Sequence, residues 1–477
     1  MEKKQENKYV SNLYMKIAGF GALAYWFGIY IKTYYGAYYI TDILCLSPAI
    51  YSLITSITSI CGFFVAPAIG AIVDCGKQGR WGKYRKWLII GPCCYSFFYI
   101  LSFLPIFSNA ALLSVFLVVT WTCTTLCEQM ILMPYYALHA QISNSPNQRT
   151  QFVSKRNFFV NVASLIYSVT NTAIIAFFAK VGGSPLWGYS GFVIFAGILN
   201  VILFYCEFKM IGNAEEQMLM DFPALGVKEK DVNAEGGRVK GPSVKDFFKN
   251  ILTNLPFALV AVQQFQFGFA TGLRNMFYVY YFNAVINNPS LYSVYIFLNS
   301  WMGIAATLTL PVWARKYENT QIAFAAFAVE TITCVGMRFT LMSSPWTALV
   351  LAMLFRYCSI IVGSINASMF QDTAVYAEWK NGTDTMATII GGSQVVGTIG
   401  SLITSALFSI ILIGSGYKAG ESITPSVSAG IINALTIYPM LSAMIAAVCA
   451  KLNPLTNAKL VQYKTEIDNR KDKRVSN

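Results

Sequence analysis

The pattern of hydrophobic and polar positions is dominated by long apolar runs that short polar or charged stretches separate. A transmembrane helix needs about 20 consecutive apolar residues, and about twelve runs reach that length. They lie at residues 14–39, 48–73, 87–106, 110–138, 158–181, 188–211, 251–283, 291–314, 319–342, 346–370, 385–414 and 425–450. Because backbone groups in lipid must hydrogen-bond within their own segment, the runs predict a bundle of helices.

The apolar runs form two sets of six, separated by a long polar and charged segment. We therefore expect a first six-helix bundle at residues 1–211, a cytoplasmic linker at 212–250 and a second six-helix bundle at 251–450. The charged tail at 451–477 is expected to fray beyond its first helical turns. A six-plus-six pattern is typical of transporters built from two repeats, with a substrate site between them near the bilayer midplane.

Lysine and arginine are concentrated in the loops on one side of the predicted bundle. The loop between the second and third runs, CGKQGRWGKYRK, is short and strongly basic, and most of the other basic loops share its side. Short basic loops remain in the cytoplasm, so both the N- and the C-terminus are expected there. The net charge of +13 is therefore interpreted as a basic face toward anionic lipid, rather than as a nucleic-acid surface.

The composition is that of an integral membrane protein. The chain is 55% hydrophobic and only 12% charged, whereas soluble domains carry about 25% charged residues. No nucleotide-binding loop, catalytic constellation or metal-ligand spacing is present in the sequence, so we expect no enzymatic activity, no cofactor and no bound metal. The single histidine, His139, is expected at a solvated helix end. The first apolar run is expected as a span and not as a cleaved signal peptide.

Several stretches together resemble one family of membrane transporters. They are GAIVDCGKQGRWGKYRKW, YYITDILCLS, MPYYALHAQISNSPNQRTQFVSKRNFF, FQDTAVYAEWKNGTD and KLNPLTNAKL. In this order they resemble the glycoside–pentoside–hexuronide:cation symporters, the melibiose permease-like branch of the major facilitator superfamily. The resemblance implies an all-α membrane protein with the major facilitator fold, which has twelve transmembrane helices in two six-helix halves and both termini in the cytoplasm.

The charged residues of these loops are interpreted as a conformational latch. Loop arginines and lysines can bond the C-terminal carbonyls of neighbouring helices or pair with acidic residues, and would hold the cytoplasmic ends of the bundle in one state. The residues predicted to form the latch are Asp74, Arg80, Lys83, Arg85, Arg149, Arg156, Asp372 and Glu378. The alternative is that these charges only set the topology.

The chain departs from the family pattern at the cation site. The resemblance places Trp26, Gly62, Ala66 and Leu132 where melibiose permease-like proteins have acidic residues on their first, second and fourth helices. Thr398 stands where the family has a lysine on the eleventh helix. Glycine and alanine side chains offer no oxygen ligands, so sodium coupling by the family's route is not expected.

Four ionisable residues stand out inside the predicted spans: Lys32, Glu128, Arg274 and Arg356. Such a residue costs roughly 2.5–3.5 kcal/mol in the bilayer even on insertion scales, so each is a candidate for function. Glu128 lies one helical turn before Leu132, on the same face. It is interpreted as a proton acceptor or as a ligand for substrate hydroxyl groups. The alternative for Glu128 is a salt bridge that holds the two halves together.

The cationic residues favour an anionic substrate, because arginine binds carboxylate, sulfate or phosphate through a planar fork. The predicted substrate-binding residues are Trp26, Lys32, Glu128, Tyr136, Gln266, Arg274, Asn275 and Arg356. The aromatic rings among them can stack on sugar faces. The alternatives are structural pairing of the arginines with Glu128 and, for Lys32, snorkelling toward the membrane surface. Glu330 and Arg338 are interpreted as a structural pair.

These features predict a secondary active transporter that moves a glycoside or sugar acid across the inner (plasma) membrane by alternating access. Uronide-like anions are favoured, and coupling is expected to be to protons through Glu128 and not to sodium. The expected partners are a small-molecule substrate, the coupling proton and the lipid bilayer; we expect a monomer that does not bind nucleic acid. The alternatives are an uncoupled facilitator or exchanger for an anionic organic solute, and a non-transporting receptor or lipid-handling protein.

Overall fold

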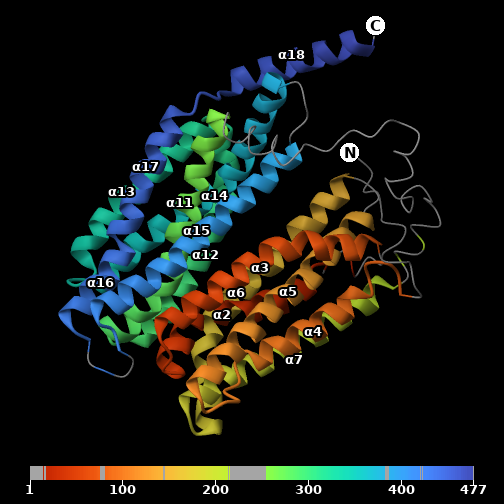
Figure 1. Cartoon of the computed structure of the whole chain (residues 1–477). Helices are drawn as coiled ribbons and strands as arrows, with labels where there is room; N and C mark the ends of the chain where they lie inside the picture. The colour runs from red at the N-terminus through yellow and green to blue at the C-terminus, as the bar shows by residue number, and fades with distance from the viewer. Residues whose placement is uncertain are drawn as a thin grey trace. The chain divides into compact units, whose positions relative to one another are not determined.

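The described part of the chain is built from helices that form two compact units, Met1–Val239 and Lys240–Asn477 (Figure 1). This computed structural model describes residues 14, 18–75, 81–142, 146–212, 214, 217, 254–381, 386–418, 421 and 423–475. The predicted linker lies almost entirely outside the described residues.

In the described part of the first unit three helices begin at a proline, and one is capped by an asparagine side chain. The helices of this unit are α2 (Phe20–Tyr38), the π-helical η1 (Tyr39–Ile43), α3 (Pro48–Cys75), α4 (Trp87–Leu101), α5 (Ala110–Gln141), α6 (Pro146–Gly182) and α7 (Pro185–Ile211). At the start of α5, the Asn109 side chain accepts hydrogen bonds from the backbone N–H groups of Ala111 and Leu112. Such a cap satisfies helix-terminal donors that have no partner within the helix.

The second unit follows the same plan. Its helices are α11 (Leu255–Tyr280), the π-helical η3 (Tyr281–Val285), α12 (Pro289–Ala314), α13 (Asn319–Thr340), α14 (Pro345–Asn381), α15 (Met386–Ser415), α16 (Pro425–Leu435), α17 (Ile437–Leu452) and α18 (Asn457–Val475). Asn254, Asn288 and Thr424 cap the starts of α11, α12 and α16. Each of these three helices has a proline in its first turn, where no backbone donor is needed.

Among the described residues, eight helices are long and apolar enough to cross a membrane. Two shorter apolar helices lie at Pro48–Gly62 and Trp87–Leu101. Some boundaries differ from the expected runs, because α6 begins at Pro146 and α14 continues to Asn381. The extra turns are polar, and hydropathy marks only the apolar part of a helix, not its ends.

The expectation that the tail frays is wrong, because α18 is a helix packed against the end of α14. Trp379 Nε1 donates a hydrogen bond to the Glu466 carboxylate, and Arg470 Nη1 donates to the Trp379 carbonyl at 2.7 Å. The Tyr463 ring lies 4.4 Å from the Trp379 ring, centroid to centroid. The hydrogen bond from Trp379 lowers the pKa of Glu466, so this acceptor is ionised at neutral pH. An aromatic anchor and two polar contacts therefore order a segment whose composition alone predicts disorder.

The two units repeat one arrangement of helices. In the first unit, α4 packs against α5 and α7, and α2 packs against α6 and α7. The corresponding pairs in the second unit are α13 with α14 and α17, and α11 with α15 and α17. In each unit the first helix ends in a π-helical segment, and a non-glycine residue with positive φ follows, Cys45 (53°) or Asn287 (54°).

A tyrosine at the start of each π segment makes the same contact in both units. The Tyr39 hydroxyl donates to the Phe103 carbonyl at 2.8 Å, beyond the end of α4. The Tyr281 hydroxyl donates to the Leu341 carbonyl at 2.6 Å, at the end of α13. Each bond ties the end of the first helix of its unit to the end of the third.

We expect Tyr39→Phe and Tyr281→Phe to lower the free energy of unfolding by similar amounts, each about 0.5–1.5 kcal/mol, because each removes one buried hydrogen bond. Equilibrium unfolding in mixed detergent micelles measures both values. Tyr205→Phe, at a half-exposed ring, is the matched control and should be nearly neutral. A large loss for one variant and none for the other would contradict the equivalence of the two contacts.

Candidate functional site

In the first unit the Lys32 ammonium group is directed at α5. Its Nζ lies 3.4 Å from Thr125 Oγ1 and 5.0 Å from the centroid of the Trp121 ring. Trp121 is buried and is itself held by a hydrogen bond from its Nε1 to the Ser102 carbonyl. A cation over a tryptophan face is a favourable contact, and it is stronger where water is excluded. Lys32 therefore points into its unit, and the snorkelling alternative does not describe it.

Glu128 lies among Lys32 and several tyrosines. Its carboxylate interacts electrostatically with Lys32 and with the Tyr25 and Tyr95 hydroxyls. The Tyr25 hydroxyl lies beside Glu128, but neither it nor the Tyr95 hydroxyl forms a hydrogen bond of ordinary geometry with a described residue. Both rings are buried. Buried hydroxyl groups without partners are positions at which a bound water or a polar ligand can complete the hydrogen bonding.

A second group of predicted residues lines a small pocket near the start of α2. Trp26 and Tyr136 lie in it together with Leu132 and Arg156. The Arg156 guanidinium lies 3.9 Å from the centroid of the Tyr136 ring. Trp26 and Leu132 are two of the positions where the resemblance expects acidic residues, and the charged residue lining this pocket is a cation. Its walls therefore offer no carboxylate ligand for a sodium ion.

In the second unit the Arg274 guanidinium is buried and contacts an aromatic ring, a tyrosine hydroxyl and a cysteine thiol. It stacks on the Phe355 ring at 3.2 Å from the centroid, and it donates to Tyr278 Oη at 3.3 Å and to Cys334 Sγ at 3.5 Å. Its Nε has no hydrogen-bond partner among the described residues. Arg274 is therefore a fixed cation with an unused donor.

Arg274 and Arg356 line one narrow pocket between α11, α12 and α14. The pocket is lined by Thr271, Arg274, Asn275, Tyr295, Asn299, Ala352, Phe355, Arg356 and Ser359. The Nε of Arg356 is also buried and lacks a hydrogen-bond partner within the described structure. The structure therefore brings together three of the predicted substrate-binding residues, Arg274, Asn275 and Arg356, with two unused guanidinium donors.

Gln266 and Glu330 form a polar cluster behind this pocket. Gln266 Nε2 donates to Glu330 Oε2 at 2.8 Å, and Ser359 Oγ donates to Glu330 Oε1 at 2.7 Å. Glu330 is fully buried, whereas Arg338 on the same helix is exposed. The expected Glu330–Arg338 pair is wrong, because eight residues of helix separate them while Gln266 and Ser359 pack directly against the carboxylate. Gln266 binds Glu330 and does not line the pocket.

Lys32 and Arg274 occupy equivalent positions in the two repeats. Each lies seven residues before the π segment of its unit. Each stacks on an aromatic ring of the fourth helix, Trp121 for Lys32 and Phe355 for Arg274. Each unit thus presents one cation from its first helix against an aromatic ring, with one buried or half-buried carboxylate nearby.

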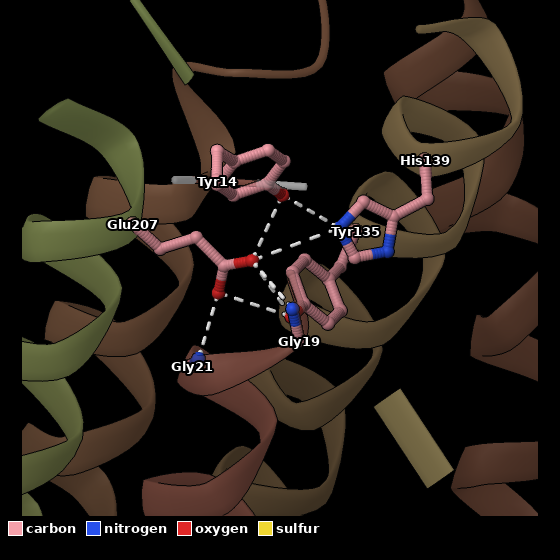
Figure 2. A network of polar contacts seen from close by, with 6 residues as sticks. All are labelled: Tyr14, Gly19, Gly21, Tyr135, His139 and Glu207. Atoms are coloured by element: carbon pink, nitrogen blue, oxygen red, sulfur yellow. Dashed lines mark hydrogen bonds and ion pairs between the residues drawn. The ribbon is translucent and has the colours of Figure 1, made fainter. Parts of the chain in front are cut away.

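A network around Glu207 joins α2, α5 and α7 (Figure 2). The fully buried Glu207 carboxylate accepts bonds from the Tyr14 hydroxyl at 2.9 Å and from the Tyr135 hydroxyl at 3.0 Å. It also accepts from the backbone N–H groups of Gly21 at 2.7 Å and Gly19 at 3.1 Å. An anion at the start of α2 satisfies helix-terminal donors and complements the helix dipole.

His139 belongs to this network and is not a solvated helix end, as the sequence analysis expected. Its ring is buried, stacks on Phe152 and places Nε2 2.8 Å from the Tyr14 hydroxyl and 3.6 Å from Glu207 Oε1. The Tyr14 hydroxyl has one proton and donates it to Glu207, so it accepts from the His139 Nε2–H. Gly19 is required nearby, because its φ is 101° and an added Cβ would lie 2.7 Å from the Arg156 Cα.

The residues of the predicted latch are found in different surroundings. Arg85 donates from Nε and Nη2 to the Phe208 carbonyl, near the end of α7, at 3.2 and 3.1 Å. Lys83 lies over the Tyr84 ring, and Asp372 lines a groove that Glu318 also lines. Glu378 is half-buried in the last turns of α14. The side chains of Asp74, Arg80 and Arg149 lie outside the described residues.

Glu207 was not among the residues predicted from the sequence. It lies in the run FYCEFKM, a carboxylate inside an apolar helix, which is the signal that singled out Glu128. Ser359 was missed for a different reason. A serine in an apolar helix is common, and only the packing of α14 against α13 makes it the partner of Glu330.

A membrane protein of two repeated helical units, each with a buried or half-buried cation and carboxylate, has the features of a secondary transporter. The family described as MFS/sugar transport protein matches residues 17–457, so the chain belongs to that family. The resemblance to the melibiose permease-like branch is thereby confirmed. The protein is a multi-pass transporter of the inner membrane and not an enzyme.

Individual relatives are distant but cover most of the chain. The inner membrane symporter YicJ of Escherichia coli is 24% identical over 395 residues, 81% of this chain and 79% of its own. The glucuronide carrier protein homolog of Escherichia coli is 24% identical over 449 residues, 91% of this chain and 90% of its own. The crystal structure of a D-xylose–proton symporter superposes with a TM-score of 0.63 at 13% identity, covering 93% of this chain and 98% of that one. This structural likeness shows the major facilitator fold.

Proposed function

We propose that this protein is a secondary active transporter that moves a glycoside or sugar acid by alternating access, and that its substrates are anionic. In this proposal twelve spans form two six-helix halves with both termini in the cytoplasm. The observation that carries the proposal is the pocket that Arg274 and Arg356 both line, together with the buried Nε donor of each guanidinium, which has no hydrogen-bond partner among the described residues. A carboxylate or sulfonate group fits such donors through charge-assisted hydrogen bonds.

The neighbouring residues support recognition of the rest of a sugar. Asn275 and Asn299 line the same pocket and can bond hydroxyl groups, and Tyr295 and Phe355 supply aromatic faces. The glucuronide carrier homolog carries an anionic sugar derivative in its name, which is consistent with this assignment. In the first unit, Lys32, Trp26 and Tyr136 are proposed to contact the substrate as well.

Protons are proposed as the coupling ion, with Glu128 as the carrier. The position of Glu128 supports this proposal, because the residue is half-buried and lies beside Lys32 and tyrosine hydroxyls. Sodium is disfavoured because Trp26 and Leu132, at two positions of the family's cation site, line a pocket without a carboxylate. The same observation favours an uncoupled exchanger of anionic solutes as the second candidate.

The loop charges are proposed to act as a latch at the cytoplasmic ends of the helices. Arg85 makes the kind of contact that such a latch needs, because it holds a carbonyl near the end of α7. Arg156, which stacks on Tyr136, would connect the latch to the pocket in the first unit.

Uptake into proteoliposomes tests the proposal. Matched pairs of probes, methyl β-glucoside and methyl β-glucuronide, are offered with and without an inward proton gradient. We expect uptake of the glucuronide to exceed that of the glucoside by at least tenfold, and to rise with the gradient. Preference for the neutral glucoside would contradict the anionic pocket. Glucuronide uptake that does not change with the proton gradient would contradict proton symport and favour the uncoupled exchanger.

A further inference from the structure

The second unit holds a buried carboxylate for which the proposed transport cycle has no role so far. Glu330 on α13 is fully buried, and its two hydrogen-bond donors, Gln266 and Ser359, are both neutral. A buried ionised carboxylate is unfavourable unless a cation compensates it. Here the compensating cation is Arg274, which attracts Glu330 electrostatically and hydrogen-bonds Cys334, one turn further along α13.

Arg274 is also the cation that would meet the substrate. It lines the pocket together with Arg356, and Ser359 lines that pocket while donating to Glu330. An anion bound at the two guanidinium groups therefore cancels part of the positive field that favours the ionised form of Glu330. Loss of that field favours the protonated carboxyl, because a buried carboxylate without a nearby cation takes up a proton.

We propose that Glu330 binds a proton when an anion occupies the pocket of Arg274 and Arg356, as a second protonation site besides Glu128. The inference rests on the proposed function and specifies the net charge that crosses the membrane in each transport cycle. One proton enters on each carboxyl from the outer side and leaves when the anion is released inside. A monoanion with two protons carries one net positive charge inward per cycle, so the membrane potential drives its accumulation.

The other ionisable groups near Glu330 do not link its protonation to anion binding in the way that the two arginines do. The ionisable side chains that interact electrostatically with Glu330 or Arg274 include Tyr278 on α11, Tyr295 on α12, Cys334 on α13 and Cys358 on α14. Arg356 on α14 lines the pocket, Arg338 on α13 is exposed, and Asp372, Glu378 and Lys380 lie in the last turns of α14. The ionisable residues of α17 are Tyr438, Cys449 and Lys451. Lys451 lies over the Phe324 ring, toward the start of α13 and away from the pocket. Only the two arginines combine a permanent charge with a position in the pocket.

The test separates the membrane potential from the pH gradient. Proteoliposomes take up methyl β-glucuronide under a potassium–valinomycin potential, negative inside, at equal pH on both sides. We expect the potential to raise the initial rate of the wild type at least fivefold. Glu330→Gln, which mimics the protonated carboxyl, should lose this response but keep glucuronide exchange and pH-driven uptake. Glu421→Gln, at an exposed glutamate, is the matched control and should keep the wild-type response.

Two further results decide the inference. A wild-type response to the potential in Glu330→Gln, or loss of exchange together with the response, would overturn it. Ser359→Ala removes a donor to the ionised carboxylate, so the pH at which potential-driven uptake is half-maximal should move upward; an unchanged pH profile would overturn it. If the wild type transports the glucuronide without responding to the potential, this inference fails while the proposed function stands. If the wild type transports no glucuronide, the proposed function itself fails.

Discussion

Glu207→Ala is expected to lower the free energy of unfolding by about 3–5 kcal/mol, because removing one partner of a buried charged network leaves the others unpaired. The substitution strips the acceptor from two tyrosine hydroxyls and from the Gly19 and Gly21 N–H groups. It also removes the anion at the start of α2. Unfolding in mixed detergent micelles and the thermal midpoint in detergent measure the loss.

Graded variants separate the acceptor role of Glu207 from general disruption. Glu207→Gln keeps one carbonyl oxygen as an acceptor, but its NH₂ group would face hydrogen-bond donors. We therefore expect a loss in the free energy of unfolding that is intermediate between the wild type and Glu207→Ala. Tyr14→Phe removes a single bond and should cost about 1 kcal/mol. Glu421→Ala is the matched control, because its ion pair with Lys418 is exposed and such pairs contribute about 0–1 kcal/mol. Equal losses for Glu207→Ala and Glu421→Ala would contradict the role of the network.

Arg274→Leu should reduce kcat/KM for methyl β-glucuronide at least thirtyfold, since truncating one partner of a buried charged contact costs about 2–5 kcal/mol. Methyl β-glucoside, which has no carboxylate, should be affected much less. Arg274→Lys keeps the charge but loses the planar fork and the stacking on Phe355. Its kcat/KM for methyl β-glucuronide should therefore lie between the values for the wild type and for Arg274→Leu. Initial uptake rates for both probes in proteoliposomes provide the comparison.

The specificity of the effect at Arg274 depends on two controls. Arg338→Leu changes an exposed arginine on α13 and should leave both uptake rates near the wild-type values. Elution of each variant as a single peak from a sizing column shows that the bundle is intact. An equal fall in glucoside and glucuronide uptake for Arg274→Leu would show that the arginine supports the structure and does not recognise the anion.

The helical membrane architecture could be predicted because hydropathy and loop charge are properties of the chain in one dimension, and the family could be predicted because several stretches of the sequence resemble it. The apolar run from residue 110, for example, corresponds closely to α5, and the one from 319 to α13. Helix ends and the tail could not be predicted in this way. The polar turn after Pro146 is helical, and α18 is ordered by Trp379, a contact between segments that are distant in the sequence.

For the candidate site, the sequence alone identified the rare charges inside apolar helices, since each such charge is costly in lipid wherever it is placed. Lys32, Glu128, Arg274 and Arg356 were found in this way, and their roles in transport stay predictions. Only the tertiary structure decided which groups face one another. It assigned Gln266 and Ser359 to Glu330, placed His139 beside Glu207, and showed Lys32 and Arg274 as equivalent cations of two repeats. The physical reason is that these contacts depend on how separate helices pack, and hydropathy along one chain contains no information about that register.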